Sequence, residues 1–132
     1  MVVVDGQGVP LGSQLTSATP AEVNFVEPTL AAIGLAKQPL RVIADRGYDS
    51  NPLRLSLRAR GIELIAPHRR NRTRHLMNDG RKLRRYRKRW KIERTFAWLG
   101  NFRRLIVRYD RLLSSYRAFF HLACALITLR FL

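Results

Sequence analysis

The stretch 40-LRVIADRGYDSNPLRLSLRARGIELIAP-67 decides the fold. It contains two short apolar runs, Leu40–Ala44 and Ile62–Ala66, of the kind that forms buried strands. Between them Ser50 can cap a helix that ends at Gly61. A strand, a helix and a second strand in this order predict an α/β fold whose sheet is at least partly parallel.

Segments on either side extend this pattern. Residues 2–4 and 9–16 predict two strands joined by a tight turn, and residues 19–35 predict a helical stretch in which Pro28 is an interior irregularity or a second start. A basic loop follows the stretch 40–67, and then come a long helix from 81 to 99 and a final helix from 114 to 132. No repeat or linker divides the chain, so we predict a single domain over residues 1–132. Because the chain begins directly in a strand, we expect a central strand to be supplied from elsewhere.

Positive charge is concentrated in one half of the chain. The net charge is +16, yet residues 1–66 hold six Lys/Arg and six Asp/Glu, whereas residues 67–132 hold 19 and three. A polyanion is the natural partner of such a half, because each neutralised phosphate releases a counterion. The alternative is a basic surface kept for solubility.

The sequence offers little sign of secretion or membrane insertion. Its single cysteine, Cys124, cannot form an internal disulfide, and its start lacks the basic region and long apolar run of a signal peptide. The most apolar stretch, Ala118 to Leu132, has 15 residues and is too short to span a bilayer. These features predict an intracellular protein that does not insert in a membrane.

Asp45 is the first candidate for chemistry. It directly follows an expected buried strand, and in open α/β sheets ligands bind at the carboxyl ends of the strands. The polar turn behind it contains Gly47, which leaves room for a metal ion or a phosphate. The alternative is that Asp45 only begins a turn or caps a helix.

Glu93 is the second candidate, as the only acid between Asp79 and Asp110. On a helix it shares one face with Tyr86 and Arg89. The alternative is an ordinary exposed ion pair between Glu93 and Arg89.

Three motifs together resemble a known family, the DDE transposases of bacterial insertion sequences. Its C-terminal signature is Tyr, two residues, Arg, three residues, Glu, six residues, Lys. Tyr86, Arg89 and Glu93 match the first three positions, and Gly100 stands in the fourth. Residues 44–50 (ADRGYDS) resemble the family's second-aspartate motif, and residues 4–11 (VDGQGVPL) resemble the hairpin between its first two aspartates. The resemblance covers nearly the whole chain and is closest to the branch named after insertion sequence number five.

The resemblance implies a ribonuclease H-like fold, a mixed sheet with flanking helices, of which this chain lacks the first strand. The family's first catalytic aspartate lies on that strand, and Asp5 belongs to the hairpin turn and does not replace it. The chain is then the C-terminal part of the transposase: a partial catalytic domain, 1–132, with a basic helical half, 67–132. It would be a fragment, a decayed copy or the second reading frame of a split gene.

The resemblance also implies a site for Mg²⁺. Asp45 and Glu93 would ligate the metal of a two-metal site that is incomplete here, so DNA strand cleavage and transfer by this chain alone would be poor or nil. Tyr86 and Arg89 would contact a DNA phosphate near the cut. Further expected DNA contacts are Arg69, Arg70, Arg72, Arg74, Arg85, Lys88, Lys91 and Arg94, with Trp90 stacking on an unpaired base.

Expected partners are transposon-end DNA and either a second copy of the chain or an upstream transposase segment, in the bacterial cytoplasm at the nucleoid. Two other functions stay open at this point. The basic half alone would suit a DNA-binding module without catalysis that regulates transposition. A non-functional remnant that folds poorly is the third possibility, since an unpaired sheet edge favours aggregation.

Overall fold

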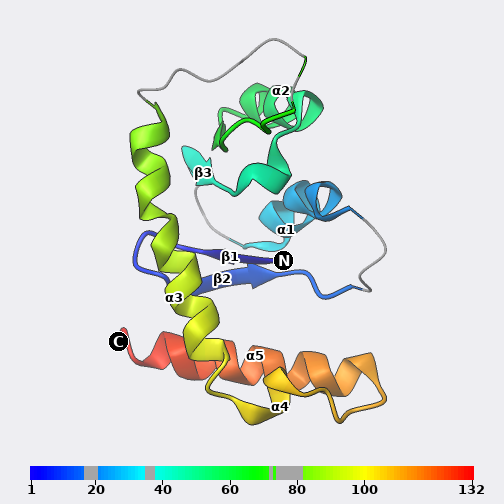
Figure 1. Cartoon of the computed structure of the whole chain (residues 1–132). Coiled ribbons are helices and arrows are strands. Elements are labelled where there is room, and N and C mark those ends of the chain that lie inside the picture. The colour runs from blue at the N-terminus through cyan, green and yellow to red at the C-terminus, as the bar shows by residue number, and fades with distance from the viewer. Residues whose placement is uncertain (17–20, 35–37, 72, 74–81) are drawn as a thin grey trace. The chain divides into compact units, whose positions relative to one another are not determined.

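The computed structural model describes residues 1–16, 21–34, 38–71, 73 and 82–132 (Figure 1). The chain forms two compact units. One, here called the hairpin unit, consists of Met1–Thr16 and Trp90–Leu132, and the other, the parallel unit, consists of Ser17–Arg89. The single domain expected from the sequence stays a prediction. Arg72 and Arg74, two of the expected DNA contacts, lie outside the described residues.

The hairpin unit begins with the expected hairpin. Strands β1 (Val2–Val4) and β2 (Pro10–Ser13) pair antiparallel, and β2 ends three residues earlier than the sequence predicts. Asp5 closes the turn, because its Oδ1 accepts hydrogen bonds from the backbone N–H groups of Gln7 and Val9 at 2.7 and 2.9 Å.

Three helices complete the hairpin unit: α3 (Trp90–Leu99), α4 (Arg103–Ile106) and α5 (Leu113–Leu129). Figure 1 shows α3 crossing the hairpin and α5 lying at the lower end of α3. The core consists of buried apolar side chains from α3 and α5, against which Val2 of β1 packs; it contains Leu99, Phe120, Ala123 and Ile127. The short helix α4 was not expected from the sequence.

The parallel unit contains the strand, helix and strand that the sequence predicts. The second strand is largely buried as expected, whereas the first is only partly buried and Leu40 before it is exposed, so the expectation of a buried strand is wrong there. Strands β3 (Arg41–Ile43) and β4 (Glu63–Ile65) pair in parallel, and α2 (Asn51–Ala59) connects them. Leu57 of α2 is fully buried. Helix α2 begins at the expected cap, where Ser50 Oγ accepts from Leu53 N at 3.4 Å. It ends before Gly61, whose φ of +74° suits a residue without a side chain.

A short 3₁₀ segment η1 (Glu22–Phe25) and the helix α1 (Val26–Ala32) precede β3. Pro28 lies in the first turn of α1, where its missing N–H removes no helical hydrogen bond. Val26 and Leu30 are buried. Of the two expectations for Pro28, an interior irregularity or a second helix start, the structure therefore shows the helix start.

The long helix expected from 81 to 99 is wrong over its first half. Residues Lys82–Arg89 form a 3₁₀ helix, η3, and the α-helix begins only at Trp90. Six of the eight side chains of η3 are cationic, and like charges three and four residues apart disfavour an α-helix. Segment η3 contacts both β3 and β4.

Among the described residues the four strands form two two-stranded sheets, and helices make up most of the rest. This is the mixed α/β composition that the sequence predicts. A search of the described helices for one that is long and apolar enough to span a bilayer found none.

Candidate functional site

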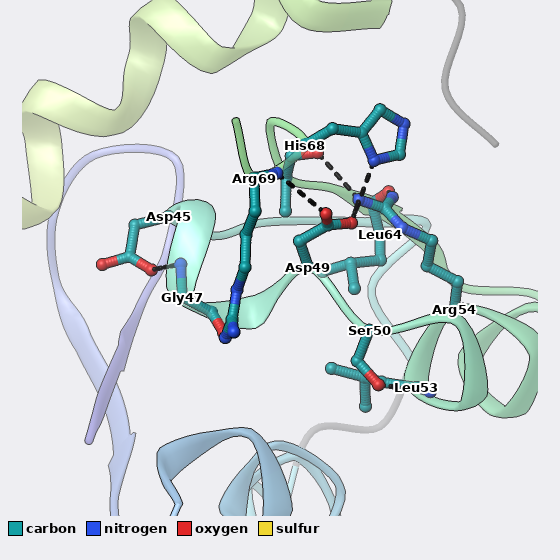
Figure 2. A network of polar contacts seen from close by, with 10 residues as sticks. Asp45, Gly47, Asp49, Ser50, Leu53, Arg54, Leu64, His68 and Arg69 are labelled. Atoms are coloured by element: carbon teal, nitrogen blue, oxygen red, sulfur yellow. Dashed lines mark hydrogen bonds and ion pairs between the residues drawn. The ribbon is translucent and has the colours of Figure 1, made fainter. Parts of the chain in front are cut away.

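Asp45 lies at the carboxyl end of β3, as expected. Strand pairing continues to the residue before it, where Ala44 N donates to Ile65 O at 3.0 Å. The Asp45 carboxylate then caps the 3₁₀ turn η2 (Arg46–Tyr48), because its Oδ1 accepts from Gly47 N at 2.7 Å (Figure 2). A Cβ on Gly47 would lie only 2.9 Å from that oxygen, so a side chain there would displace the Asp45 carboxylate from this position. The Asp45 side chain remains 47% exposed.

Arg89 lies beside Asp45 within the same unit. Its Nη1 is 3.7 Å from Asp45 Oδ2, and its guanidinium lies over the ring of Tyr86, 5.8 Å from the ring centroid. The Asp45 motif and the Tyr86/Arg89 motif are far apart in the sequence, and the fold brings them together. The spacing of Tyr86 and Arg89 predicted a shared face, and the structure confirms it on a 3₁₀ helix rather than an α-helix.

A second acid of the same turn, Asp49, is held quite differently. Its side chain is 1% exposed, and its Oδ1 lies 3.1 Å from Arg54 Nη2 and 3.0 Å from His68 Nδ1 (Figure 2). Its Oδ2 accepts from Arg69 N at 3.0 Å. We call these four residues the Asp49 network. A buried charge of this kind is tolerated only when it is paired and hydrogen-bonded.

The Asp49 network ties the turn that follows β3 to the end of β4. Arg54, 5% exposed, also donates to Leu64 O at 3.0 Å and to Ala66 O at 2.8 Å. The Arg69 side chain returns to the turn and donates to Gly47 O at 2.8 Å. The backbone that carries Asp45 is thus fixed from the neighbouring strand.

Tyr48 fixes the other side of this turn. Its hydroxyl donates to Glu22 Oε2 at 2.9 Å and so connects η2 with η1. Burial raises the pKa of Tyr48 far above its usual value, and the hydrogen bond to Glu22 raises this pKa further. The hydroxyl therefore stays a donor throughout the neutral and mildly alkaline range.

Asp45 is suited to a hard cation, but only as one member of a ligand set. Carboxylate oxygens are the protein ligands that Mg²⁺ prefers. Oδ1 of Asp45 is engaged by the turn, while Oδ2 faces Arg89 and solvent. Among the described residues, no three His, Cys, Asp or Glu side chains are grouped closely enough to hold a metal ion.

Glu93 lies in the first turn of α3, in the hairpin unit, with an exposed side chain. Two expected DNA contacts near it have partners within this unit: Lys91 Nζ donates to Gly6 O, and Arg94 Nη2 donates to Gln7 O. Their contact with DNA stays a prediction, and it would compete with these hydrogen bonds.

The two tryptophans of α3 enclose Arg94. Its guanidinium lies 4.8 Å from the ring centroid of Trp90 and 4.7 Å from that of Trp98. Trp98 packs against the core and against Phe131, whereas Trp90 is 51% exposed. Trp90 is therefore the tryptophan whose ring is open to a stacking partner.

The remaining expected DNA contacts are exposed in the parallel unit; they are Arg69, Arg70, Arg85 and Lys88. Sequence reasoning missed Asp49 and Arg54 as the residues that fix the Asp45 turn. One signal was available, since Arg54 stands directly after Leu53, on the apolar side of α2. A cation at such a position needs a buried partner.

Comparison with known proteins agrees with these motifs. Residues 1–128 match the family described as "Transposase DDE domain". The chain is 43% identical, over 96% of its length, to a Burkholderia cepacia protein named as a transposase for insertion sequence element IS402. It is 33% identical, over 97% of its length, to a Brucella ovis protein named as a transposase for element IS6501.

The chain spans 60% of the Burkholderia relative and 95% of the Brucella relative. No solved structure matches it. The expected branch and the expected C-terminal placement stay predictions. The family that the sequence motifs indicated is confirmed, and the chain belongs to the DDE transposases of insertion sequences.

Proposed function

We propose that this chain supplies the second and third metal-binding carboxylates, Asp45 and Glu93, of a transposase that cleaves and joins DNA strands. The observation that carries the proposal is the approach of Arg89 to Asp45, 3.7 Å between Nη1 and Oδ2. It places an anion-binding guanidinium next to a half-exposed carboxylate. A DNA phosphate and a divalent cation are the ligands that such a pair can take up together.

The metal we propose is Mg²⁺. When two such ions are bound, about 3.5–4 Å apart, they stabilise the attacking and the leaving oxygen of the phosphoryl transfer. Asp45 and Glu93 both have accessible oxygen donors, in keeping with this role. We propose that the first carboxylate of the site comes from another transposase segment.

Arg89 and Tyr86 would bind and orient the phosphate at the site of cleavage. The 3.7 Å separation of Arg89 from Asp45 is longer than the 2.7–2.9 Å or so of a strong charge-assisted hydrogen bond. The guanidinium can therefore keep its place on the Tyr86 ring and still turn N–H groups to an incoming phosphate.

The wider DNA surface would consist of cations that contact phosphates without reading sequence. Arg69, Arg70, Arg85 and Lys88 are exposed, which supports this role, and Arg72 and Arg74 belong to the same basic segment. Lys91, Arg94 and a base stacked on Trp90 would extend this surface along α3.

We also propose that the complete fold is ribonuclease H-like, with the missing strand supplied by an upstream segment. Within the described residues β1 pairs only with β2, and β3 pairs only with β4. A further strand beside β1 or β3 would convert these small sheets into parts of a larger one and would bring the first carboxylate. On this proposal the chain alone cleaves DNA poorly, and its partners are transposon-end DNA and the upstream segment or a second copy.

A chimera tests the catalytic proposal. The part of the Burkholderia cepacia relative that this chain does not match is joined to the chain, and Mg²⁺-dependent nicking of transposon-end DNA is measured. Asp45→Asn and Glu93→Gln are each expected to reduce nicking to background. Asp110→Asn is the matched control, because it changes an acid that pairs at 3.9 Å with Arg104, outside the proposed site. Nicking that is indifferent to Glu93→Gln would refute the proposal.

The exposed cations also suit the second candidate, a DNA-binding module without catalysis that regulates transposition. Its test is the affinity of the unmodified chain for duplex DNA at several salt concentrations, measured by fluorescence anisotropy. Arg85→Ala and Lys88→Ala together should lower the slope of log K against log salt by about two. Binding that follows this rule while the chimera ignores Asp45 and Glu93 would favour the module over the nuclease.

A further inference from the structure

The helix that carries Glu93 is held to the hairpin turn by a set of side-chain hydrogen bonds. Three consecutive carbonyls of the turn accept hydrogen bonds from three side chains of α3. The pairs are Gly6 with Lys91, Gln7 with Arg94, and Gly8 with Thr95. We call these three hydrogen bonds the turn grip.

Thr95 is the buried centre of the turn grip. Its side chain is fully buried, and its Oγ1 donates to Gly8 O at 2.6 Å. The same hydroxyl lies 3.1 Å from Lys91 O, one turn earlier in the helix. Loss of this hydroxyl would leave a buried carbonyl without its donor, which is the costly way to lose a hydrogen bond.

Gly8 is shaped for this contact. Its φ of +91° lies in the region that favours glycine. A Cβ there would meet Arg94 Nη2 at 3.1 Å, Thr95 Oγ1 at 3.2 Å and Lys91 O at 3.3 Å. The turn therefore approaches α3 as closely as a backbone without a side chain allows.

The turn grip determines which way Glu93 points. Lys91, Arg94 and Thr95 are spaced i, i+3 and i+4 and so share one face of α3. At 3.6 residues per turn Glu93 lies about 200° around the helix from Lys91, on the opposite face. Glu93 and Phe96 are exposed there, while Thr95 and Leu99 are buried.

From this geometry we propose that the turn grip is a positioning device for Glu93. Thr95, assisted by Lys91 and Arg94, fixes the rotation of α3 about its axis and so holds the Glu93 carboxylate in the direction that metal binding requires. The inference rests on the proposed function, in which Glu93 is a metal ligand. Thr95 is a positioning residue, since it acts through Gly8 and the helix.

The first experiment measures the turn grip itself in the unmodified chain. Thr95→Val keeps the shape of the side chain and removes the hydroxyl, whereas Thr95→Ser keeps the hydroxyl. Hydrogen exchange at the amides of turn 5–8 and of α3 should become about tenfold faster in the valine variant. The serine variant should exchange like the original chain. Unchanged exchange in the valine variant would overturn the inference.

Thr29→Val provides the matched control. Thr29 is also fully buried, but its Oγ1 has no hydrogen-bond partner among the described residues. The same substitution there should leave exchange in turn 5–8 unchanged. Faster exchange in this control would mean that turn 5–8 responds to any loss of a buried hydroxyl, and it would overturn the assignment to Thr95.

The second experiment asks whether the turn grip matters for metal use. In the chimera described above, Thr95→Val should raise the Mg²⁺ concentration for half-maximal nicking about tenfold, the lower end of the effects seen for residues that orient metal ligands. DNA affinity should not change, and Thr95→Ser should restore the Mg²⁺ midpoint. Faster exchange with an unchanged midpoint would overturn the positioning role and leave the proposed function intact. Nicking that survives Glu93→Gln would instead remove the proposed function, whatever the exchange rates show.

Discussion

The two predicted site acids stand on supports of different kinds. In the parallel unit, the turn of Asp45 is fixed by the Asp49 network, which is built on the buried ion pair of Asp49 and Arg54. In the hairpin unit, the helix of Glu93 is fixed by hydrogen bonds to three backbone carbonyls. Removal of one partner from a buried ion pair leaves an uncompensated charge, whereas removal of a donor to a carbonyl costs only one hydrogen bond. A single substitution in the Asp49 network should therefore cost much more unfolding free energy than a single substitution in the turn grip.

The steepest effect is expected for Asp49→Asn. It leaves the Arg54 guanidinium buried without its anion, so the parallel unit should lose about 3–5 kcal/mol of unfolding free energy. Asp45→Asn makes the same chemical change in the same turn. It should cost less than about 1 kcal/mol, since that pair is half exposed and an Asn oxygen can still accept from Gly47 N.

Urea unfolding followed by amide hydrogen exchange measures both variants. Equal losses of unfolding free energy for Asp45→Asn and Asp49→Asn would contradict the special role given to the buried Asp49. The same data test the single domain expected from the sequence, because in a single cooperative domain the amides of α5 lose protection together with those of β3 and β4.

The next effect concerns the other support. Gly8→Ala forces a side chain into a positive-φ position that is crowded by Arg94 and Thr95, and should cost about 1–3 kcal/mol. Gly6→Ala is the control two residues away, where a Cβ would meet no atom within 4 Å. Thermal unfolding of the two variants gives the comparison. A cost at Gly8 above that of Asp49→Asn would reverse the proposed ranking of the two supports.

Ser50→Ala should have a smaller effect. Its Oγ accepts from Leu53 N at 3.4 Å, a long hydrogen bond, so loss of this cap should cost about 0.5–1 kcal/mol. The cap begins the helix that carries Arg54. This variant therefore shows whether the Asp49 network depends on the capped start of α2. Urea midpoints of Ser50→Ala and of the Ser50→Thr control provide the measurement, and a loss as large as that of Asp49→Asn would be incompatible with this account.

The smallest effect is a dependence on pH. The pKa of Glu63 is lowered, first by the hydrogen bond from Lys82 at 2.5 Å and then by Arg41, although partial burial opposes this. A carboxyl whose folded pKa is depressed stabilises the fold above its unfolded pKa, near 4.5, and loses that contribution as the pH falls through the lower folded value.

Glu63→Gln should therefore remove roughly 0.5 kcal/mol at neutral pH, and this difference from the original chain should disappear in acid. Unfolding free energies at pH 7 and pH 3 test this expectation. A difference that grows as the pH falls would have the wrong sign.

Local patterns in the sequence were sufficient for much of the parallel unit. The apolar runs, the Ser50 cap and Gly61 predicted its strands and its helix, because each depends on neighbours within a few residues. The end of β3 at Asp45 followed for the same reason. The spacing of Tyr86 and Arg89 predicted their shared face, although not its 3₁₀ form.

The two supports could not be predicted in this way. In the sequence Asp45 and Asp49 differ little, and only the tertiary contact with Arg54 and His68 makes one of them a buried anchor. The turn grip joins the first residues of the chain to α3, and no local periodicity encodes such a contact. Lys91 and Arg94 looked like two more cations of a basic surface, because their carbonyl partners are invisible in the sequence.

The location of the two tryptophans that enclose Arg94 has a practical consequence. Trp90 and Trp98 are the only tryptophans of the chain, and both belong to α3. Indole emission excited at long wavelength thus comes entirely from the hairpin unit, while the parallel unit contains only the tyrosines Tyr48 and Tyr86. Tryptophan fluorescence therefore reports on the unfolding of the hairpin unit alone, without a contribution from the parallel unit.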